Sequence, residues 1–289
     1  MTTRPLATVT GASGYLGSRI CATLESKGWQ VVRLVRSPGQ GRGRGCSYDL
    51  GAPVSPEVSE LLGSTDVLVH AAYDLTLTRA ADIWRVNVEG TRRLLRVASD
   101  AGVRRILVLS SMSAFEGTTQ LYGRAKLAIE AMTEQFGGCS VRPGLVYGEH
   151  SSGMAGALRK LVRLPVVPLI AGEARLYTVS ENDLMTVVAA LAAADALPAG
   201  TISAAHPVPV PMLDLMTAFA GRQGADCRFV KVPWKPVYGL LRAAETVGLH
   251  PPFRADSLLG LVHGAPKVVN SEILAKMGVS VRAFDSAPG

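Results

Sequence analysis

The sequence predicts an α/β fold in which helices cover both faces of a doubly wound parallel sheet. Short apolar runs alternate with helical patterns over the first 150 residues, and parallel strands need such crossovers. A glycine-rich turn directly after the first run is the second observation. The strands are expected at Leu6–Thr10, Gln30–Val35, Val67–His70, Arg105–Leu109 and Cys139–Arg142, and the helices at about 14–27, 80–101 and 122–136.

The turn after the first strand contains Gly11, Gly14 and Gly17, and apolar residues at helical spacing follow it. Glycine at the first two positions lets the backbone approach a pyrophosphate, whose charge is met by free N–H groups and the positive end of a helix. Gly17 lets the helix pack closely on the strand. An isolated glycine triplet is an ordinary turn about half the time, so the strand before it and the helix after it give the motif its weight.

The chain is long enough to bury a large core, with 289 residues of which 48% are hydrophobic and 18% charged. After residue 150 prolines interrupt the pattern repeatedly. We therefore expect an NAD(P)-binding domain over residues 1–150 and a smaller substrate-binding lobe over 151–289, partly interleaved with the sheet. No apolar run has the length of a membrane span, and the N-terminus lacks the features of a signal peptide. A cytoplasmic protein with no membrane partner is expected.

The four cysteines are scattered, without a close pair and without clustered histidines, so neither a disulfide framework nor a metal site is expected. The formal net charge of +7 is modest. Basic residues are spread along the chain except around 33–44, which favours small anionic ligands over nucleic acid. The segment 36–45 is rich in Gly, Pro and Arg and is predicted to be an exposed loop.

A Tyr and a Lys stand four residues apart at Tyr122 and Lys126, which places them on one face of a predicted helix. Ser110 and Ser111 end the strand before that helix. Reduction of a carbonyl needs a proton donor, a positive charge beside that donor and a hydroxyl that fixes the oxygen. Tyr122, Lys126 and Ser111 are the candidates for these roles. A turn or helix cap is the alternative interpretation of the two serines.

Taken in order, these motifs resemble those of the extended short-chain dehydrogenase/reductases, the NAD(P)-dependent epimerase/dehydratase family. The resemblance runs from residue 5 to about 220. The matching segments are Thr10–Gly17 for TGxxGxxG, Asp49–Leu50, Asp66–Ala72 for DxxxHxA, Asn87–Thr91 for NVxGT, Ser110–Ser111, Tyr122–Lys126 for YxxxK and Arg142–Gly148 for RPxxVYG.

The resemblance implies a Rossmann-type sheet with a smaller C-terminal lobe, a nicotinamide dinucleotide, and Ser111, Tyr122 and Lys126 as the catalytic residues. The residues expected to contact the dinucleotide are Gly11, Ser13, Gly14, Tyr15, Leu16, Arg36, Asp49, Leu50, Ala71, Ala72, Tyr73, Asn87, Lys126, Pro143 and Val146.

Two departures from the family pattern bear on the reaction. Phe115 stands where many relatives have the Tyr of a V-Y-G turn, which makes Ser111 the better match for the active hydroxyl and Ser113 the fallback. Met112 and Ser113 stand where dehydratases of this family usually have an acidic pair. Without that general acid, dehydration is disfavoured.

The end of the second strand bears on the choice of cofactor. An acidic residue there would bind the ribose hydroxyls of NAD and repel a 2′-phosphate, whereas this chain has Arg36, with Arg33 nearby. Either arginine would attract a 2′-phosphate. NADP is therefore predicted, with NAD as the second choice. The alternative is that both arginines are simply solvated beside the loop.

The substrate is predicted less closely. It is expected to be a small molecule, and Ser113, Arg175 and Arg254 are the candidate contacts. The favoured hypothesis is a nucleotide-sugar 4-keto reductase. Such an enzyme must exchange its dinucleotide at each turnover, and the exposed loop 37–45 beside the adenosine site, with no evident segment to cover it, would allow this exchange. The alternatives are a nucleotide-sugar epimerase, a reductase of a hydrophobic ketone and a non-catalytic NADP-binding redox sensor. The identity of the substrate, the direction of the reaction and a homodimer are left open.

Overall fold

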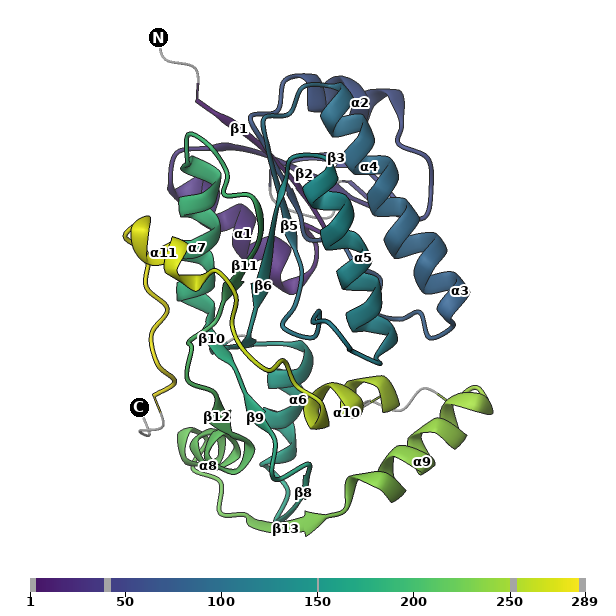
Figure 1. Ribbon diagram of the computed structural model, residues 1–289, viewed down its shortest axis with the longest axis vertical. Coiled ribbons are helices and arrows are strands. Elements are labelled where there is room, and N and C mark those ends of the chain that lie inside the picture. Colours follow the sequence, from purple (N-terminus) through teal and green to yellow (C-terminus); the bar gives the residue numbers. More distant parts are fainter. Residues whose placement is uncertain (1–3, 39–42, 150, 250–253, 286–289) are drawn as a thin grey trace.

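Seven parallel strands form the central sheet of the computed structural model, which describes residues 4–38, 43–149, 151–249 and 254–285. The strand order is β11-β6-β5-β4-β1-β2-β3, with helices on both faces (Figure 1), which confirms the predicted fold class. Because the order reverses beside β1, this sheet is doubly wound. Its strands are β1 Leu6–Thr10, β2 Gln30–Val35, β3 Arg44–Ser47, β4 Val67–His70, β5 Arg105–Leu109, β6 Cys139–Pro143 and β11 Gly200–Ala204.

Two apolar cores lie on the two faces of the sheet, because side chains alternate along each strand. Val67 and Val69 pack on one face, and Leu68 between them packs on the other. The first face is covered by α1 Tyr15–Ser26, α7 Glu181–Ala193 and α11 Ser271–Lys276. The second face is covered by α2 Pro56–Gly63, α3 Ala80–Ile83, the π-helix η1 Trp84–Val88, α4 Glu89–Asp100 and α5 Leu121–Gln135.

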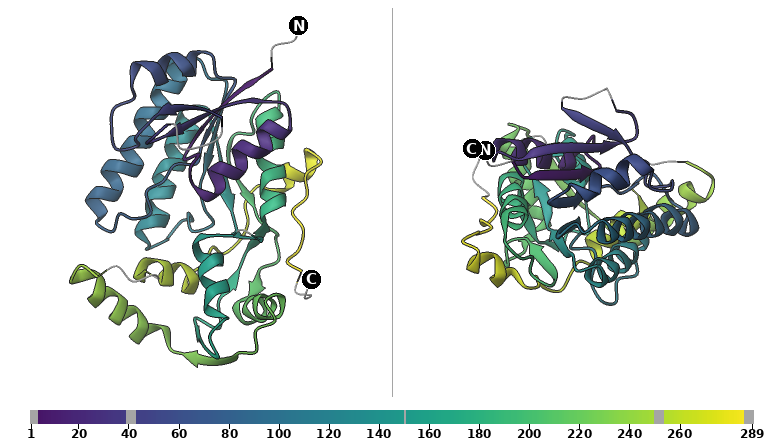
Figure 2. Two further views of the ribbon diagram at one scale, coloured as in Figure 1. Left: turned by 180° about the vertical axis from the view of Figure 1, so that it is seen from behind. Right: turned by 90° about the horizontal axis from the view of Figure 1, so that it is seen from above.

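A third core holds together elements that lie beyond the carboxyl ends of the central strands. Figure 2 shows this group below the sheet from behind as well. Its elements are β7 Leu145–Tyr147, α6 Gly153–Leu161, β8 Val166–Ile170, β9 Arg175–Leu176, β12 Val210–Pro211, α8 Met212–Arg222, β13 Arg228–Val232 and α10 Ala255–Val262. Two further elements adjoin this core: β10 Thr178–Ser180 pairs with β7, and α9 Trp234–Thr246 lies against α10. The division at residue 150 stays a prediction, and β11 returns from this part of the chain to the central sheet.

Two strands of the central sheet were not expected. The predicted exposed loop 36–45 is wrong at its end, because Arg44 and Gly45 belong to β3, which pairs with β2; residues 39–42 lie outside the described residues. β11 is also new. Both are short segments without a continuous apolar run, so pairing with a neighbouring strand, rather than composition, fixes their structure. In the described residues, no helix combines the length and apolarity needed to cross a bilayer.

Candidate active site

Ser111, Tyr122 and Lys126 come together at the carboxyl end of β5. Ser111 follows that strand, and α5 carries the other two. The Ser111 hydroxyl faces the Tyr122 phenol closely enough to lower its pKa. Lys126 Nζ donates to the carbonyl of Leu109, 2.7 Å away, and lies 5.9 Å from the centre of the Tyr122 ring. Ser113 donates its backbone N–H to Ser111 Oγ over 3.1 Å, and Ser111, not Ser113, is the serine that acts on the Tyr122 pKa.

Burial tunes the two titratable groups of this trio in opposite senses. Loss of solvation raises the pKa of Tyr122 to about 12, and the polar Ser111 side chain opposes this rise. Loss of solvation lowers the pKa of Lys126 to about 8, against the pull of the Glu130 carboxylate. At neutral pH the phenol is therefore a proton donor, and the amine beside it is mostly a cation.

Glu130 anchors α5 to the sheet one turn beyond Lys126. Its carboxylate accepts hydrogen bonds from Arg142 Nε at 2.7 Å and Arg142 Nη2 at 2.6 Å, and from the Ser110 hydroxyl. Both partners of this ion pair are largely buried. Breaking such a pair leaves an unpaired buried charge, at a cost of about 3–5 kcal/mol, so the pair fixes the helix that bears Tyr122 and Lys126.

Tyr73 forms the opposite wall of this site. Its ring meets the Tyr122 ring edge-on, with 5.1 Å between centroids and 79° between planes. The Lys126 ammonium lies 4.5 Å from the Tyr73 centroid, which is a cation–π contact. The Tyr73 hydroxyl is buried and has no hydrogen-bond partner among the described residues. A buried donor of this kind normally has a partner, so Tyr73 can bind a ligand that enters the site.

Asn87 holds the segment that carries Tyr73. Its Oδ1 accepts the N–H of Asp74 at 2.7 Å, and its Nδ2 donates to the carbonyl of Asp74 at 3.2 Å. Asn87 is fully buried in the π-helix η1. Its amide is thus bonded to the backbone, and the expected contact with the dinucleotide stays a prediction.

Residues from α10 close over the start of the catalytic helix. Asp256 accepts the backbone N–H of Leu121 at 2.9 Å and of Tyr122 at 3.1 Å. Arg254 donates to the carbonyl of Leu75 at 3.0 Å. Sequence analysis missed Asp256, because it lies far along the chain from α5. One signal in the sequence was Gln120 at the N-cap position of α5, because glutamine is a poor N-cap residue. It makes no side-chain cap there, which indicates that another residue must accept the first N–H groups of the helix.

The glycine turn after β1 leaves the start of α1 open. Gly11 has φ of +64°, and a Cβ there would lie 2.8 Å from the Ala72 backbone. A Cβ on Gly17 would lie 2.1 Å from the Gly11 carbonyl oxygen. α1 has neither a side-chain cap at Gly14 nor an acidic residue in its first turn. Its first N–H groups lack intrahelical partners, so the turn fits an anionic pyrophosphate.

The neighbours of the turn have separate environments. Ser13 is exposed, and Leu16 packs against the core. Tyr15 donates its hydroxyl to the Glu181 carboxylate, which also pairs with Arg19. This contact ties the start of α1 to α7.

The other residues expected to contact the dinucleotide lie at or beyond the carboxyl ends of the strands, as the glycine turn does. Ala71, Ala72 and Tyr73 directly follow β4, Pro143 ends β6, and Val146 lies in β7. Asp49 is exposed after β3, and its Oδ1 accepts the Gly51 N–H at 2.7 Å. Leu50 is buried in the second core.

The two arginines considered for a 2′-phosphate differ in their surroundings. Arg36 is exposed immediately after β2. Arg33 Nη2 lies 2.8 Å from a carboxylate oxygen of Glu25, and a Cβ on Gly43 would lie 2.2 Å from Arg33 Nη1. The ion pair engages Arg33 Nη2, and Nη1 is buried without a hydrogen-bond partner among the described residues. Arg36, whose side chain is exposed, is the better candidate for a 2′-phosphate.

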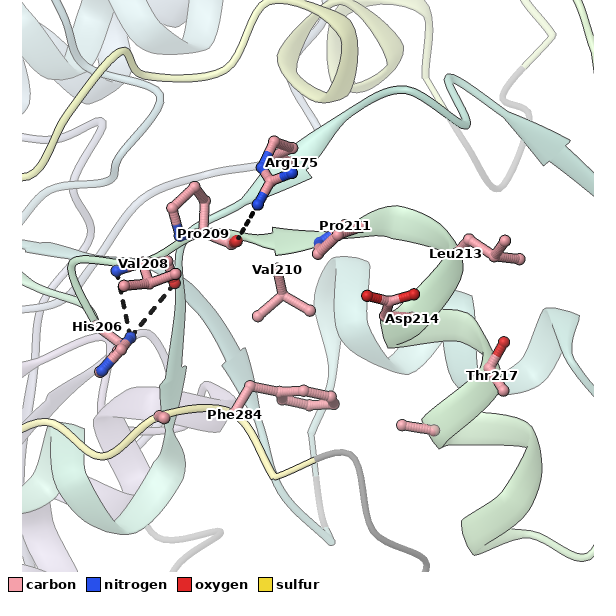
Figure 3. A pocket seen from close by; sticks show the side chains of 12 residues that line it. Arg175, His206, Val208, Pro209, Val210, Pro211, Leu213, Asp214, Thr217 and Phe284 are labelled. Carbon is pink, nitrogen blue, oxygen red and sulfur yellow. Dashed lines mark hydrogen bonds between the residues drawn. The ribbon is translucent and has the colours of Figure 1, made fainter.

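Arg175 lines an open cleft of about 710 Å³ that Arg254 does not line (Figure 3). Its guanidinium donates to the carbonyl of Pro209 at 3.4 Å. His206, Asp214 and Phe284 also line the cleft, whereas Ser111, Tyr122 and Lys126 do not. The structure thus does not bring the two nominated substrate arginines together. No cluster of three or more metal-binding side chains occurs in the described part of the chain.

Comparison with known proteins gives a family match and several relatives. A sequence model of the NAD dependent epimerase/dehydratase family matches residues 7–201. A ceramide reductase of Caulobacter vibrioides is 27% identical over 238 residues, which cover 80% of this chain and 74% of the relative. A 4-hydroxy-2-methyl-3-oxo-4-farnesyl-3,4-dihydroquinoline-1-oxide ketoreductase of Stigmatella aurantiaca is 26% identical over 280 residues, 86% of this chain and 83% of the relative.

Solved structures share the fold at lower identity. MoeE5 in complex with UDP-glucuronic acid and NAD superposes with a TM-score of 0.74 at 19% identity, over 96% of this chain and 94% of that chain. The terminal R domain from the myxalamid PKS-NRPS biosynthetic pathway gives a TM-score of 0.74 at 19% identity, over 99% and 89%.

Proposed function

We propose, from the premise that this chain belongs to the NAD-dependent epimerase/dehydratase family, that it is an NADP-dependent oxidoreductase that interconverts an apolar ketone and its secondary alcohol. The observation that carries this proposal is the contact of Tyr122 with Ser111, beside the ammonium of Lys126. These are the proton donor, the orienting hydroxyl and the positive charge that reduction of a carbonyl requires.

The dinucleotide would be held by the turn Gly11–Gly17 at the open start of α1, and Arg36 would meet the 2′-phosphate of NADP. When bound, it supplies a hydride to the carbonyl carbon or accepts one from the alcohol carbon. Tyr73 lies on the segment after β4, which Asn87 holds from η1, and this segment would close the nicotinamide side of the site.

Side chains of the protein supply the proton that the carbonyl oxygen receives during reduction. Ser111 donates a hydrogen bond to the carbonyl oxygen, and Tyr122 transfers its phenolic proton to the same oxygen as charge develops there. The phenolate that results is stabilised by the Lys126 cation, which the Leu109 carbonyl holds in place. Oxidation of the alcohol uses the same groups in reverse.

The shape of the site supports an apolar substrate. The faces around the reacting position are the rings of Tyr73 and Tyr122, which offer apolar surface. Arg175, one of the two expected pyrophosphate contacts, lines a cleft that Ser111, Tyr122 and Lys126 do not line, which weakens the case for a nucleotide substrate at the reacting position. The names of two relatives refer to ceramide and to a farnesylated quinoline, which are apolar compounds.

A nucleotide-sugar 4-keto reductase is the second candidate. Arg175 favours it, because this cation lines the cleft of Figure 3 and is available to a phosphate.

The test is the loss of NADPH absorbance with two substrate panels. Long-chain aliphatic and isoprenoid ketones form the first panel, and UDP-4-keto sugars form the second. We expect turnover with the first panel and equimolar formation of secondary alcohol. Turnover restricted to the second panel would reverse the ranking, and isomerisation of UDP-sugars without added cofactor would indicate an epimerase.

A further inference from the structure

Exposed apolar side chains gather on one part of the molecule. Six of the nine large hydrophobic residues that are exposed in the described chain lie on or directly beside β8, β13 and α9. β8 pairs with β13, which leads into α9. These six residues are Leu164, Val166, Val230, Leu240, Val247 and Leu249.

α9 presents an apolar stripe to the outside. Pro236, Leu240, Ala243 and Val247 are all exposed, and their spacing places them along one face of a helix. Leu240 is 72% exposed and Val247 74%. No residue of this helix is buried among the described residues. Figure 1 shows α9 on the side of α10 that faces away from the sheet, and Figure 2 shows the same arrangement from behind.

Positive charge accompanies this stripe. Residues 228–249 contain four basic side chains and one acidic side chain, Glu245. The Glu245 carboxylate accepts the Ala255 N–H at 2.9 Å and lies 3.6 Å from Arg242. Lys235 and Arg242 stand seven residues apart, which places both on the same flank of the stripe. Apolar residues flanked by Lys and Arg are typical of helices that lie in the interface of an anionic membrane.

We propose that α9, together with β8 and β13, docks on the surface of an anionic phospholipid bilayer. The apolar stripe enters the acyl boundary, and Lys235 and Arg242 contact the lipid phosphates. This inference departs from the expectation of no membrane partner. It goes beyond the proposed function, because docking needs neither the dinucleotide nor turnover.

Hydrogen bonds connect α9 to α5 through α10. Glu245 near the end of α9 bonds the start of α10 at Ala255. The next residue, Asp256, bonds the backbone of Tyr122. A docked α9 would therefore place the active site next to the bilayer, from which an apolar substrate can enter.

Cosedimentation of the full chain with vesicles tests this proposal. We expect binding to phosphatidylcholine mixed with phosphatidylglycerol, weak binding to phosphatidylcholine alone, and release by salt. Leu240→Asp/Val247→Asp should reduce the partition coefficient about tenfold or more. Lys235→Ala/Arg242→Ala should reduce it about tenfold to thirtyfold. The matched control is Val208→Asp/Leu213→Asp, which adds the same charge at exposed apolar positions on the Figure 3 cleft and should bind like the wild type.

Three results would overturn the proposal. The wild type fails to bind anionic vesicles, or the control pair loses as much binding as the α9 pair, or gel filtration shows that the α9 pair converts a dimer to a monomer. The last result would mean that a second copy of the chain covers the stripe. Circular dichroism of each variant shows whether it folds. The single variant Lys235→Ala, which removes one exposed charge, should also weaken binding and provides a second test that does not disturb the Arg242–Glu245 pair.

Discussion

Asp256 and Tyr122 are joined by a hydrogen bond between carboxylate Oδ2 and the Tyr122 backbone N–H, 3.1 Å long. The other oxygen accepts the neighbouring N–H of Leu121 at 2.9 Å. A residue of α10 thus caps the helix that carries Tyr122, the proposed proton donor. The C-terminal part of the chain thereby positions the start of α5.

Removal of this cap should weaken both stability and catalysis. Asp256→Ala leaves two N–H groups at the start of α5 without partners, so we expect a loss of about 1 kcal/mol in the free energy of unfolding and a fall in kcat that exceeds any change in KM. Asp256→Asn, which keeps one acceptor, should recover part of both losses. Steady-state kinetics and urea unfolding measure these effects, with the distant Asp226→Ala as the control. An unchanged kcat in Asp256→Ala would contradict a positioning role.

The Tyr73 hydroxyl should matter for binding more than for folding. Tyr73→Phe removes a buried donor that lacks a partner in the described chain and keeps the ring against Tyr122. We expect a stability equal to or above that of the wild type, and a KM for the ketone raised about tenfold. Thermal unfolding and initial rates check this. A destabilised variant with an unchanged KM would show that the hydroxyl has a structural partner instead.

The pH dependence of reduction should report Lys126. Its pKa is lowered to about 8, so the amine is charged below that pH and neutral above it. Because the cation stabilises the Tyr122 phenolate, kcat/KM for reduction should fall as pH rises through about 8, about tenfold for each further unit. A profile that stays flat from neutral pH to well above that value would contradict this role.

The preference for NADPH over NADH should depend on Arg36 and not on Arg33. Arg36→Ala should reduce the preference for NADPH over NADH by about 1.5–3 kcal/mol, the range for a charged hydrogen bond. Arg33→Ala is the matched control, because Arg33 is paired with Glu25, and it should leave the preference unchanged. Fluorescence titration of both dinucleotides measures this. Equal affinities in the wild type would refute the assignment of NADP.

Strands with continuous buried apolar runs were predictable from the sequence. The expected bounds of β1, β2, β4 and β5 agree with the structure, because full burial requires apolar residues on both faces of a parallel strand. β3 contains Arg44 and Gly45 and carries no such signal. The single helix expected at 80–101 is instead divided among α3, η1 and α4.

The candidate site was predictable where its residues are close in sequence. The spacing of Tyr122 and Lys126 implies one helix face, and Ser111 ends a strand beside them. Asp256 could not be predicted, because its bond to α5 depends on how distant elements pack. The ion pair of Arg33 with Glu25 was missed for the same reason, since it links β2 to α1.

Proton donation by Tyr122 is the central claim, and a comparison of Tyr122→Phe with the wild type tests it most directly. The variant keeps the ring and loses only the donor. NADPH consumption with a ketone substrate at saturating cofactor should fall by about two to four orders of magnitude, while NADPH binding and thermal stability stay near wild type and the control Tyr238→Phe remains active. Retention of most of the activity by Tyr122→Phe, with cofactor bound, would contradict the account.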